Sequence, residues 1–202
     1  MTTGSAQGQG RSGMAPVFRF DTNSPYAYLA AMRVDEVLGA GVEWEPIAFG
    51  FLLRAQGRRP WSFDEPTRSQ GIAECQSRAA ARGLPPLRWP PGWPIDSYSL
   101  EPLRALTAAR AHGRERELAR ALFHRNFVVG EGLRAAEVIR SCWVEVGLDV
   151  ESYASELEAA KASLTGATDR AIAEGVPGVP TVTVGGRHFW GDDQLEAAAG
   201  AL

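Results

Sequence analysis

The chain has 202 residues, of which 45% are hydrophobic and 22% are charged, as is usual for a folded globular protein. This length suits one sizeable domain, or one domain with a large insertion. The formal net charge is −3 and the isoelectric point is near 5.7, so no nucleic-acid partner is expected, because such partners require a concentrated basic face. No apolar run approaches the ~20 residues needed to cross a bilayer, so no membrane association is expected either.

Residues 1–16, MTTGSAQGQGRSGMAP, are rich in Gly, Ser and Gln and lack the apolar core of a signal peptide. We expect a disordered tail, because this segment buries too little apolar surface to offset the entropy of ordering. The two cysteines, Cys75 and Cys142, form neither a C-x-x-C pair nor a metal-ligand cluster, so no metal site is predicted. Free buried thiols and a cytoplasmic location are expected.

The first regular segment is VFRFD at 17–21, where apolar and polar residues alternate as in a strand. Ser24 and Pro25 then mark the start of a helix, since serine is a good cap and proline needs no partner for an N–H in the first turn. The helix is predicted to run to about Gly39, a typical stop. Alternation returns in VEWEPIAF at 42–49, so a strand–helix–strand unit with parallel strands is predicted.

From residue 51 to about 174 the sequence predicts helices without strands. The exception is LPPLRWPPGWP at 84–94, whose five prolines exclude a regular element. The predicted helices comprise one that ends near Gly83, two alanine-rich helices that are broken near His112-Gly113, and three further helices at 134–147, 151–163 and 164–175.

The C-terminal segment returns to β structure. Two short strands, Thr181–Val184 and Arg187–Trp190, flank Gly185-Gly186, a dipeptide typical of a tight hairpin. A final short helix is expected to carry Asp192 and Asp193 in its first turn, where the helix dipole favours acidic side chains.

In chain order these elements read βαβ, then a helical block, then αββα. This is the layout of an α/β protein with a thioredoxin-like domain and a large all-helical insertion. The thioredoxin-like domain would comprise 17–50 and 175–202, with a helix at 164–174 joining it, and the inserted helical domain would comprise 51–163.

Three motifs resemble those of the kappa-class glutathione transferases and 2-hydroxychromene-2-carboxylate isomerases, in the DsbA-like branch of thioredoxin folds. FDTNSPYAYLA resembles their F-D-x-x-S-P-Y-x-Y-L-A opening, and RWPPGWPIDS is similar to their P-P-x-x-P-x-x-S segment. The most specific match is GVPGVPTVTVGGRHFWGDDQL, which resembles their G-V-x-G-V-P-T-x-x-V-x-G-x-x-F-W-G-x-D-R-L ending. Together the motifs extend the resemblance over about residues 16–202.

The resemblance implies an enzyme that uses glutathione. Ser24 would donate a hydrogen bond to the sulfur of bound glutathione and hold it as a thiolate. Val179, before a cis Pro180, would offer its backbone N–H and C=O to the tripeptide. Asp193 and the neighbouring Asp192 would receive the γ-glutamyl amino group. The resemblance also implies a homodimer.

The chemistry at Ser24 follows from the properties of thiols. Glutathione is mostly protonated at neutral pH, since a thiol of this kind has a pKa of about 8.5. A hydroxyl donor at a helix N-terminus favours the thiolate through its hydrogen bond and through the helix dipole. Serine need not lose its own proton, so no histidine partner is required, and His112, His124 and His188 show no triad spacing.

Structural interpretations of the same residues stay open at this stage. Ser24 is equally suited to capping the helix, and the two roles can coexist. Pro180 can be a trans proline at the start of a strand, because cis bonds are only about 5–6% of X-Pro bonds. Asp192 and Asp193 can serve only the N-terminus of the last helix.

Aromatic and basic residues suggest a substrate site. Tyr26 and Trp89 are predicted to contact a flat aromatic substrate, with the proline-rich segment 84–94 as a lid. Two residues depart from the family pattern: Arg58 in GRRP replaces the Asn of G-N-x-P, and Gln194 replaces the Arg of D-R-L. Arg54, Arg58 and Arg59 are more often solvated than buried, but if one of them reaches the cleft, its guanidinium would pair with a substrate carboxylate.

We therefore expect an isomerase of the 2-hydroxychromene-2-carboxylate type that uses glutathione, or another low-molecular-weight thiol, and acts on a small aromatic acid. A kappa-like transferase and a thioredoxin-like binding module without turnover are the alternatives. Disulfide exchange by the dithiol route is excluded, because Ser24 and Ala27 occupy both C-x-x-C positions and that step requires a sulfur nucleophile.

Overall fold

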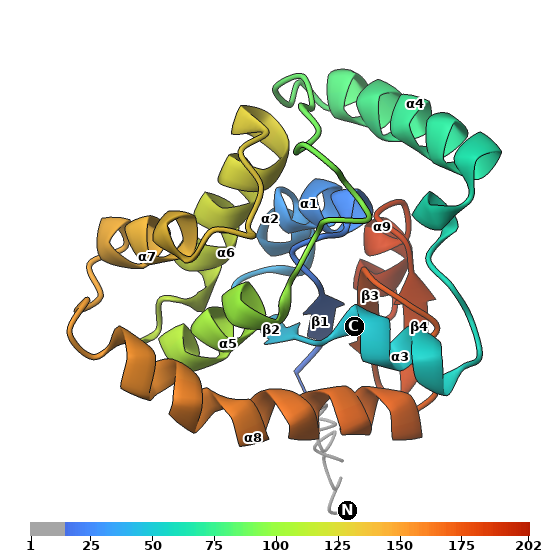
Figure 1. The fold of residues 1–202 in the computed structure, drawn as a ribbon. Coiled ribbons are helices and arrows are strands. Elements are labelled where there is room, and N and C mark those ends of the chain that lie inside the picture. Colours follow the sequence, from blue (N-terminus) through green and yellow to red (C-terminus); the bar gives the residue numbers. More distant parts are fainter. Residues whose placement is uncertain (1–14) are drawn as a thin grey trace, which may run out of the picture.

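The computed structural model describes residues 15–202, so the predicted disordered tail lies outside the described residues except for its last two positions. A four-stranded sheet with the order β2-β1-β3-β4 lies at the centre of the molecule (Figure 1). The strands are β1 (Val17–Phe20), β2 (Glu43–Pro46), β3 (Thr181–Val184) and β4 (Arg187–Trp190). β1 and β2 are parallel, as the strand–helix–strand pattern predicts, and β3 is antiparallel to both β1 and β4.

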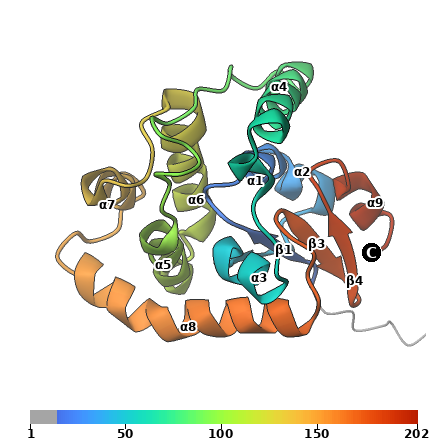
Figure 2. The same ribbon diagram turned by 45° about the vertical axis from the view of Figure 1, so that its right-hand side comes forward.

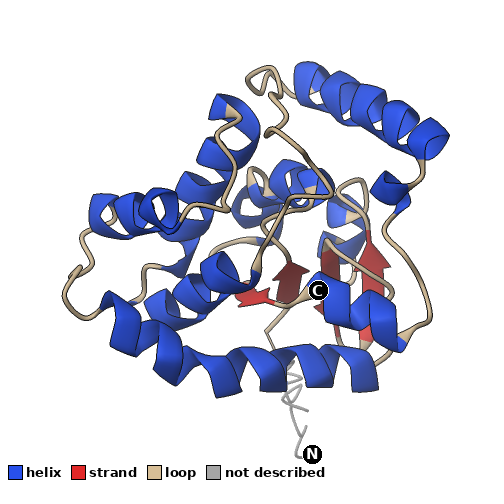
Figure 3. Ribbon diagram, viewed as in Figure 1, coloured by secondary structure: helices blue, strands red, loops and turns tan. Residues whose placement is uncertain are grey.

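Helices surround the sheet and dominate the molecule (Figure 3). They are α1 (Pro25–Ala31), α2 (Val34–Leu38), α3 (Phe49–Ala55), α4 (Glu65–Ala81), α5 (Leu100–Ala109), α6 (Glu115–Phe123), α7 (Ala136–Glu145), α8 (Tyr153–Ala173) and α9 (Leu195–Ala199). Short 3₁₀ turns lie at Trp61–Phe63 and Arg110–His112, and a π-helical segment at His124–Val129 continues α6. Within residues 15–202, no helix combines the length and the apolar character that a membrane span requires.

Two of the predicted helices have different limits. The helix expected to run to about Gly39 is interrupted at Met32-Arg33, and the chain turns there so that Val34 and Leu38 of α2 are buried. The segments 151–163 and 164–175 form one helix, α8, because its buried side chains continue along one face past the expected break. α8 runs below the other elements in Figures 1 and 2 and packs against α5 and α3.

The two faces of the sheet differ because successive side chains of β1 point to opposite sides. Phe18 and Phe20 share one face, with ring centroids 5.2 Å apart, and the ring of Trp44 meets Phe18 edge-on at 5.1 Å. Arg19 points to the other face, where its Nε lies 2.8 Å from a carboxylate oxygen of Glu45. Both partners of this ion pair are buried, so an ion pair takes the place of apolar packing on that face.

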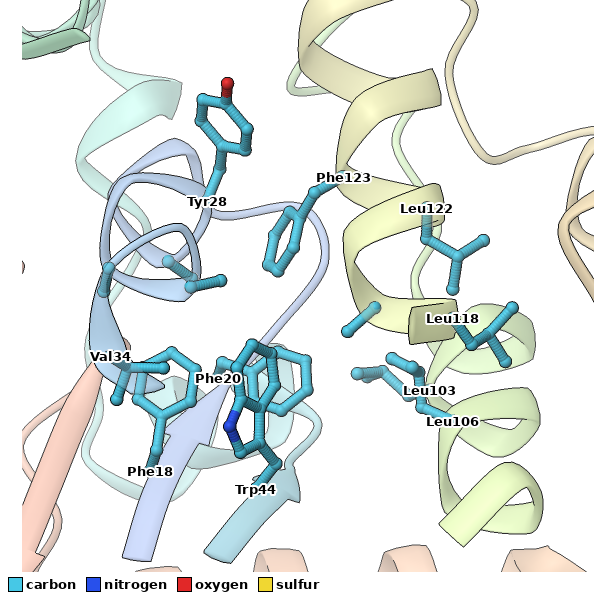
Figure 4. Packing of buried hydrophobic residues seen from close by; sticks show 14 of the residues in the cluster. Phe18, Phe20, Tyr28, Val34, Trp44, Leu103, Leu106, Leu118, Leu122 and Phe123 are labelled. Atoms are coloured by element: carbon cyan, nitrogen blue, oxygen red, sulfur yellow. The ribbon is translucent and has the colours of Figure 1, made fainter. Parts of the chain in front are cut away.

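The sheet and the inserted helices share one hydrophobic core. Figure 4 shows Phe123 and Leu118 of α6 and Leu103 of α5 on the side of the sheet that carries Phe20 and Trp44. The ring centroids of Phe20 and Phe123 are 6.0 Å apart, and all five side chains are fully buried. Burying a side chain of this size contributes roughly 1.5–3 kcal/mol. The helical segment is therefore held to the sheet by apolar packing.

The C-terminal hairpin forms as predicted, and Gly185 and Gly186 at its tip have φ angles of +54° and +82°. Positive φ angles at both positions are what a tight two-residue turn requires. α9 begins only at Leu195, so the prediction that Asp192 and Asp193 lie in its first turn is wrong. In the turn before the helix, Asp192 forms ion pairs with arginines from the α4 region.

Candidate active site

A cavity of about 560 Å³ lies at the end of the sheet where β1 and β4 finish and β3 begins. This volume is within the range of small-molecule sites. The walls come from the β1–α1 turn, the segment from α3 to α4, the proline-rich segment, and the loops on either side of the hairpin. Seven of the eight site residues predicted from the sequence line this cavity: Ser24, Tyr26, Arg58, Val179, Pro180, Asp192 and Asp193. Trp89 does not.

Ser24 caps α1 and also faces the cavity. Its Oγ accepts a hydrogen bond from the N–H of Ala27 at 3.2 Å, and the residue is only 8% exposed. A hydroxyl that accepts one hydrogen bond can still donate its own proton, and no acceptor for that proton is found among residues 15–202. The cap therefore leaves the hydroxyl proton of Ser24 available for donation to a ligand.

The protein's own thiols are not suited to act as nucleophiles beside Ser24. Cys75 and Cys142 are free and buried, as predicted. Burial raises the pKa of the Cys75 thiol to about 12 and that of the Cys142 thiol to about 11. Both thiols are therefore protonated at neutral pH, and the thiolate is the reactive form. Any sulfur nucleophile in the cavity must come from a diffusible molecule.

The Val179–Pro180 peptide bond is cis, as the resemblance implies. Its loop is tied to the loop after β4, because the N–H of Gly191 donates to the carbonyl of Pro180 at 3.0 Å. Neither the N–H nor the C=O of Val179 has a hydrogen-bond partner within the described part of the chain. These two groups are therefore available to pair with an extended, peptide-like ligand.

Asp192 and Asp193 are adjacent in sequence but differ in environment. Asp192 is fully buried, and it forms ion pairs with Arg78, at 2.6 Å, and with Arg82. Asp193 has 54% of its side chain exposed and lies 3.7 Å from the nearest nitrogen of Arg78. Asp192 is therefore already ion-paired with arginines of the protein, whereas the exposed Asp193 can accept hydrogen bonds from a ligand.

Tyr26 is held in place by a carboxylate on α4. Its hydroxyl donates to Glu74 at 2.8 Å, and Arg78 donates to the other oxygen of Glu74 at 2.5 Å. Burial, with smaller effects from Cys75 and Glu74, raises the pKa of the Tyr26 phenol. The hydrogen bond from Tyr26 is in turn the main cause that lowers the pKa of Glu74. Tyr26 is thus a neutral side chain whose donor is already used, and it presents its ring to the cavity.

Three rings form what we call the aromatic wall: Tyr26, Trp61 and Trp93. The centroid of Trp61 lies 5.7 Å from that of Tyr26 and 5.9 Å from that of Trp93. Trp61 also packs on Gly71 of α4, where an added Cβ would come within 2.7 Å of its ring. Trp89 lies outside the cavity, with its ring 4.6 Å from that of Trp93. The proline-rich segment therefore contributes Trp93 to the cavity in place of the predicted Trp89.

Two arginines reach the cavity from the segment after α3. Arg58 donates to the carbonyl of Pro177 at 2.6 Å, and its guanidinium lies 5.4 Å from the ring centroid of Trp190. Arg59 has no hydrogen-bond partner and no carboxylate within 4.0 Å among residues 15–202. Arg54, a third arginine nearby, does not line the cavity.

Asp21 follows β1 directly and is 2% exposed. Its carboxylate oxygens accept hydrogen bonds from the N–H of Asn23 at 2.9 Å, the N–H of Phe49 at 3.1 Å and the hydroxyl of Ser99 at 3.1 Å. Burial raises its pKa above the usual value, although these hydrogen bonds oppose the shift. Asp21 therefore joins the β1–α1 turn, the start of α3 and the start of α5 around one buried group.

The sequence analysis did not single out Asp21, Glu74 or Arg78. Asp21 could have been found from its position directly after a predicted strand, because ligands in α/β proteins commonly bind beyond the carboxyl ends of strands. Glu74 and Arg78 are four residues apart and share one face of α4. Nothing in the sequence shows that this face turns toward the cavity.

Fold and site together define a thioredoxin-like protein in which a serine replaces the first sulfur of the dithiol motif. Residues 17–202 match the family model of the DSBA-like thioredoxin domain, and the chain belongs to this family. The 2-hydroxychromene-2-carboxylate isomerase of Sphingobium xenophagum is 27% identical over 186 residues, which cover 89% of this chain and 93% of that protein. The family resemblance of the three motifs is thereby confirmed.

Solved structures show the same fold. A 2-hydroxychromene-2-carboxylate isomerase superposes with a TM-score of 0.81 at 24% identity, covering 93% of this chain and 95% of that one. The cytosolic disulfide reductase DsbM from Pseudomonas aeruginosa, solved with GSH, has a TM-score of 0.60 at 16% identity and covers 91% of this chain and 96% of its own. The predicted fold class, an α/β thioredoxin-like protein with a DsbA-like helical insertion, is confirmed.

Proposed function

We propose that the protein is a glutathione-dependent isomerase that acts on 2-hydroxychromene-2-carboxylate or a related aromatic acid. The observation that carries this proposal is the free hydroxyl donor of Ser24, in a cavity to which the protein brings no reactive sulfur of its own. The similarity to the Sphingobium xenophagum isomerase over most of both chains supports the type of reaction.

The residues of the cavity fit glutathione. The N–H and C=O of Val179, which have no hydrogen-bond partner within residues 15–202, suit the peptide backbone of the tripeptide, and Ser24 suits its sulfur. Asp193 suits the γ-glutamyl ammonium. We do not assign that role to Asp192, which is already bound to Arg78 and Arg82. When bound, glutathione would supply a thiolate for reversible addition to the conjugated double bond of the substrate; the C–O bond of the hemiketal ring would break to give a phenol and a ketone, the former double bond could then rotate, and expulsion of the thiolate would restore the double bond.

Ser24 would lower the pKa of the bound thiol. A hydrogen bond to a charged group contributes roughly 1.5–3 kcal/mol, and one unit of pKa corresponds to about 1.4 kcal/mol. One such bond is therefore enough to lower the pKa of a thiol from about 8.5 to about 7. At that value about half of the bound thiol would be ionised at neutral pH. The aromatic wall would position the flat ring of the substrate beside this sulfur.

The proposal is tested by incubating the protein with 2-hydroxychromene-2-carboxylate with and without glutathione. Isomerisation is followed by the change in the absorption spectrum, and glutathione is measured before and after. We expect turnover only with glutathione, which is returned unchanged. Consumption of glutathione into an adduct would instead identify a kappa-like transferase. Binding of glutathione in a calorimeter without turnover would identify a binding module and would overturn the isomerase.

A further inference from the structure

We propose that Arg59 binds the carboxylate of the aromatic substrate and selects for anionic substrates, whereas Arg58 is a positioning residue of the cavity wall. This inference rests on the proposed function. Among the three arginines that the sequence offers for this role, Arg54, Arg58 and Arg59, it selects Arg59, although the departure from the family motif draws attention to Arg58.

Arg58 is already occupied by the protein. It donates to the carbonyl of Pro177 at 2.6 Å, and Gln56 beside it donates to the carbonyl of Val176 at 2.7 Å. These bonds hold the loop that leads into Val179. The guanidinium also lies over the ring of Trp190. Arg58 therefore ties together two parts of the wall, and a ligand would have to break these contacts in order to use it.

Arg59 stands out among the arginines that line the cavity. Arg78 has carboxylate partners in Glu74 and Asp192, and Arg58 has a carbonyl and an aromatic ring. Within the described residues, Arg59 has neither a hydrogen-bond partner nor an ion-pair partner, and its side chain is exposed. A guanidinium in this condition can offer a two-pronged hydrogen bond to a carboxylate without losing an existing contact.

The position of Arg59 favours the aromatic substrate over glutathione as its partner. Arg59 is separated by one residue from Trp61, which belongs to the aromatic wall. Arg59 and the wall line the same cavity, so a flat ring held by the wall would bring an attached carboxylate within reach of this cation. The groups that suit the tripeptide, Val179 and Asp193, come instead from the loops around the hairpin.

The inference is tested with two unreactive probes, 2-naphthoate and its neutral analogue 2-naphthamide. Their affinities are measured by calorimetry and by quenching of tryptophan fluorescence for the wild type, Arg59→Gln and the control Arg54→Gln. Arg54 is an exposed arginine of the same region that does not line the cavity. We expect Arg59→Gln to lower the affinity for 2-naphthoate roughly 10- to 100-fold, which is the effect of losing one charged hydrogen bond. Its affinity for 2-naphthamide should stay within about twofold of the wild type. Arg54→Gln should change neither probe.

Three results would overturn the assignment. The wild type could bind both probes with equal affinity, Arg59→Gln could lose affinity for both probes equally, or Arg59→Gln could keep the wild-type affinity for both. Glutathione affinity is measured on the same variants, and a loss confined to glutathione would assign Arg59 to the thiol instead. Because the probes are not turned over, the result is independent of the isomerase assay. If Arg59→Gln loses affinity for 2-naphthoate alone and the wild type shows no thiol-dependent turnover, the proposed reaction is rejected and the carboxylate site is kept.

Discussion

Ser24 and Val179 reach the cavity from the ends of strands, whereas Trp61 and Trp93 reach it from segments without strands. We call the first pair, with Asp193, the thiol side, and the aromatic wall with Arg59 the aromatic side. The thiol side is built from short-range features, a capping hydroxyl and a loop before a strand. The aromatic side depends on packing between distant segments. The comparison teaches that the two sides of the cavity come mainly from separate parts of the chain, and that Tyr26, two residues after Ser24, is the member of the aromatic wall that adjoins the thiol side.

The largest expected effect is on stability, at the buried ion pairs of Asp192 beside Asp193 of the thiol side. Asp192→Ala removes the buried partner of Arg78 and Arg82, and we expect a loss of about 3 kcal/mol in the free energy of unfolding, measured in urea. The matched control is Asp193→Ala, which removes a mostly exposed carboxylate and should cost less than about 1 kcal/mol. Equal losses in the two variants would show that Asp192 has no special structural role.

Ser24→Ala should impair the thiol side of the cavity and leave ligand binding at the aromatic side unchanged. Without the hydroxyl donor, we expect the pKa of the bound thiol to rise and turnover to fall roughly 100-fold. The lost helix cap should cost about 1 kcal/mol in stability. Affinity for 2-naphthoate, a ligand of the aromatic side, should stay within about twofold of the wild type.

Ser24→Thr is the control for that experiment, because threonine keeps both the hydroxyl and the cap. The thiol pKa is read from the ultraviolet absorbance of the thiolate as the pH is varied. Unchanged turnover in Ser24→Ala would remove Ser24 from the mechanism.

Gly71→Ala should act on the aromatic side alone. The added Cβ would overlap the ring of Trp61, so we expect a loss of about 2 kcal/mol in stability and weaker binding of 2-naphthamide. Glutathione affinity should be unchanged. Gly166→Ala is the control, since its Cβ would meet only Arg170 at an ordinary 3.6 Å. That variant should gain up to about 1 kcal/mol from helix propensity. If Gly71→Ala lowered the affinities for 2-naphthamide and glutathione equally, the separation of the two sides would be contradicted.

The smallest expected effect is at Asp21, which joins the two sides. Asn keeps the shape but leaves one backbone N–H without an acceptor, so Asp21→Asn should cost about 1 kcal/mol at acidic pH. Burial raises the pKa of Asp21 above the ordinary 3.8, so the native state holds this proton to higher pH than the unfolded state does.

The sign of the pH dependence follows from that shift. As the pH rises from 3.8 through the raised native pKa, the stability advantage of the wild type over Asp21→Asn should decrease. Urea unfolding of both proteins between about pH 4 and pH 8 measures this difference. A difference that stays constant with pH would show that Asp21 titrates as it does in the unfolded chain.

Most of the fold could be predicted because its signals are local. The alternation of Phe18, Arg19 and Phe20 predicts β1, and Gly185-Gly186 predicts the hairpin. The length of α8 could not be predicted in this way, because its face at 164–173 is fixed by packing against α3. The place of Asp192 was missed for the same reason, since Arg78 binds it from far away in the sequence.

The amino-acid sequence by itself determined the positions of the four strands, the cap at Ser24 and the replacement of both sulfurs of the dithiol motif, because each depends on neighbours within a few residues. Only the tertiary structure decided that Trp93 rather than Trp89 lines the cavity, and that, within residues 15–202, Arg58 has hydrogen-bond partners whereas Arg59 has none. These outcomes depend on contacts between segments that are distant along the chain, and no local pattern of residue types encodes which side chain faces which partner.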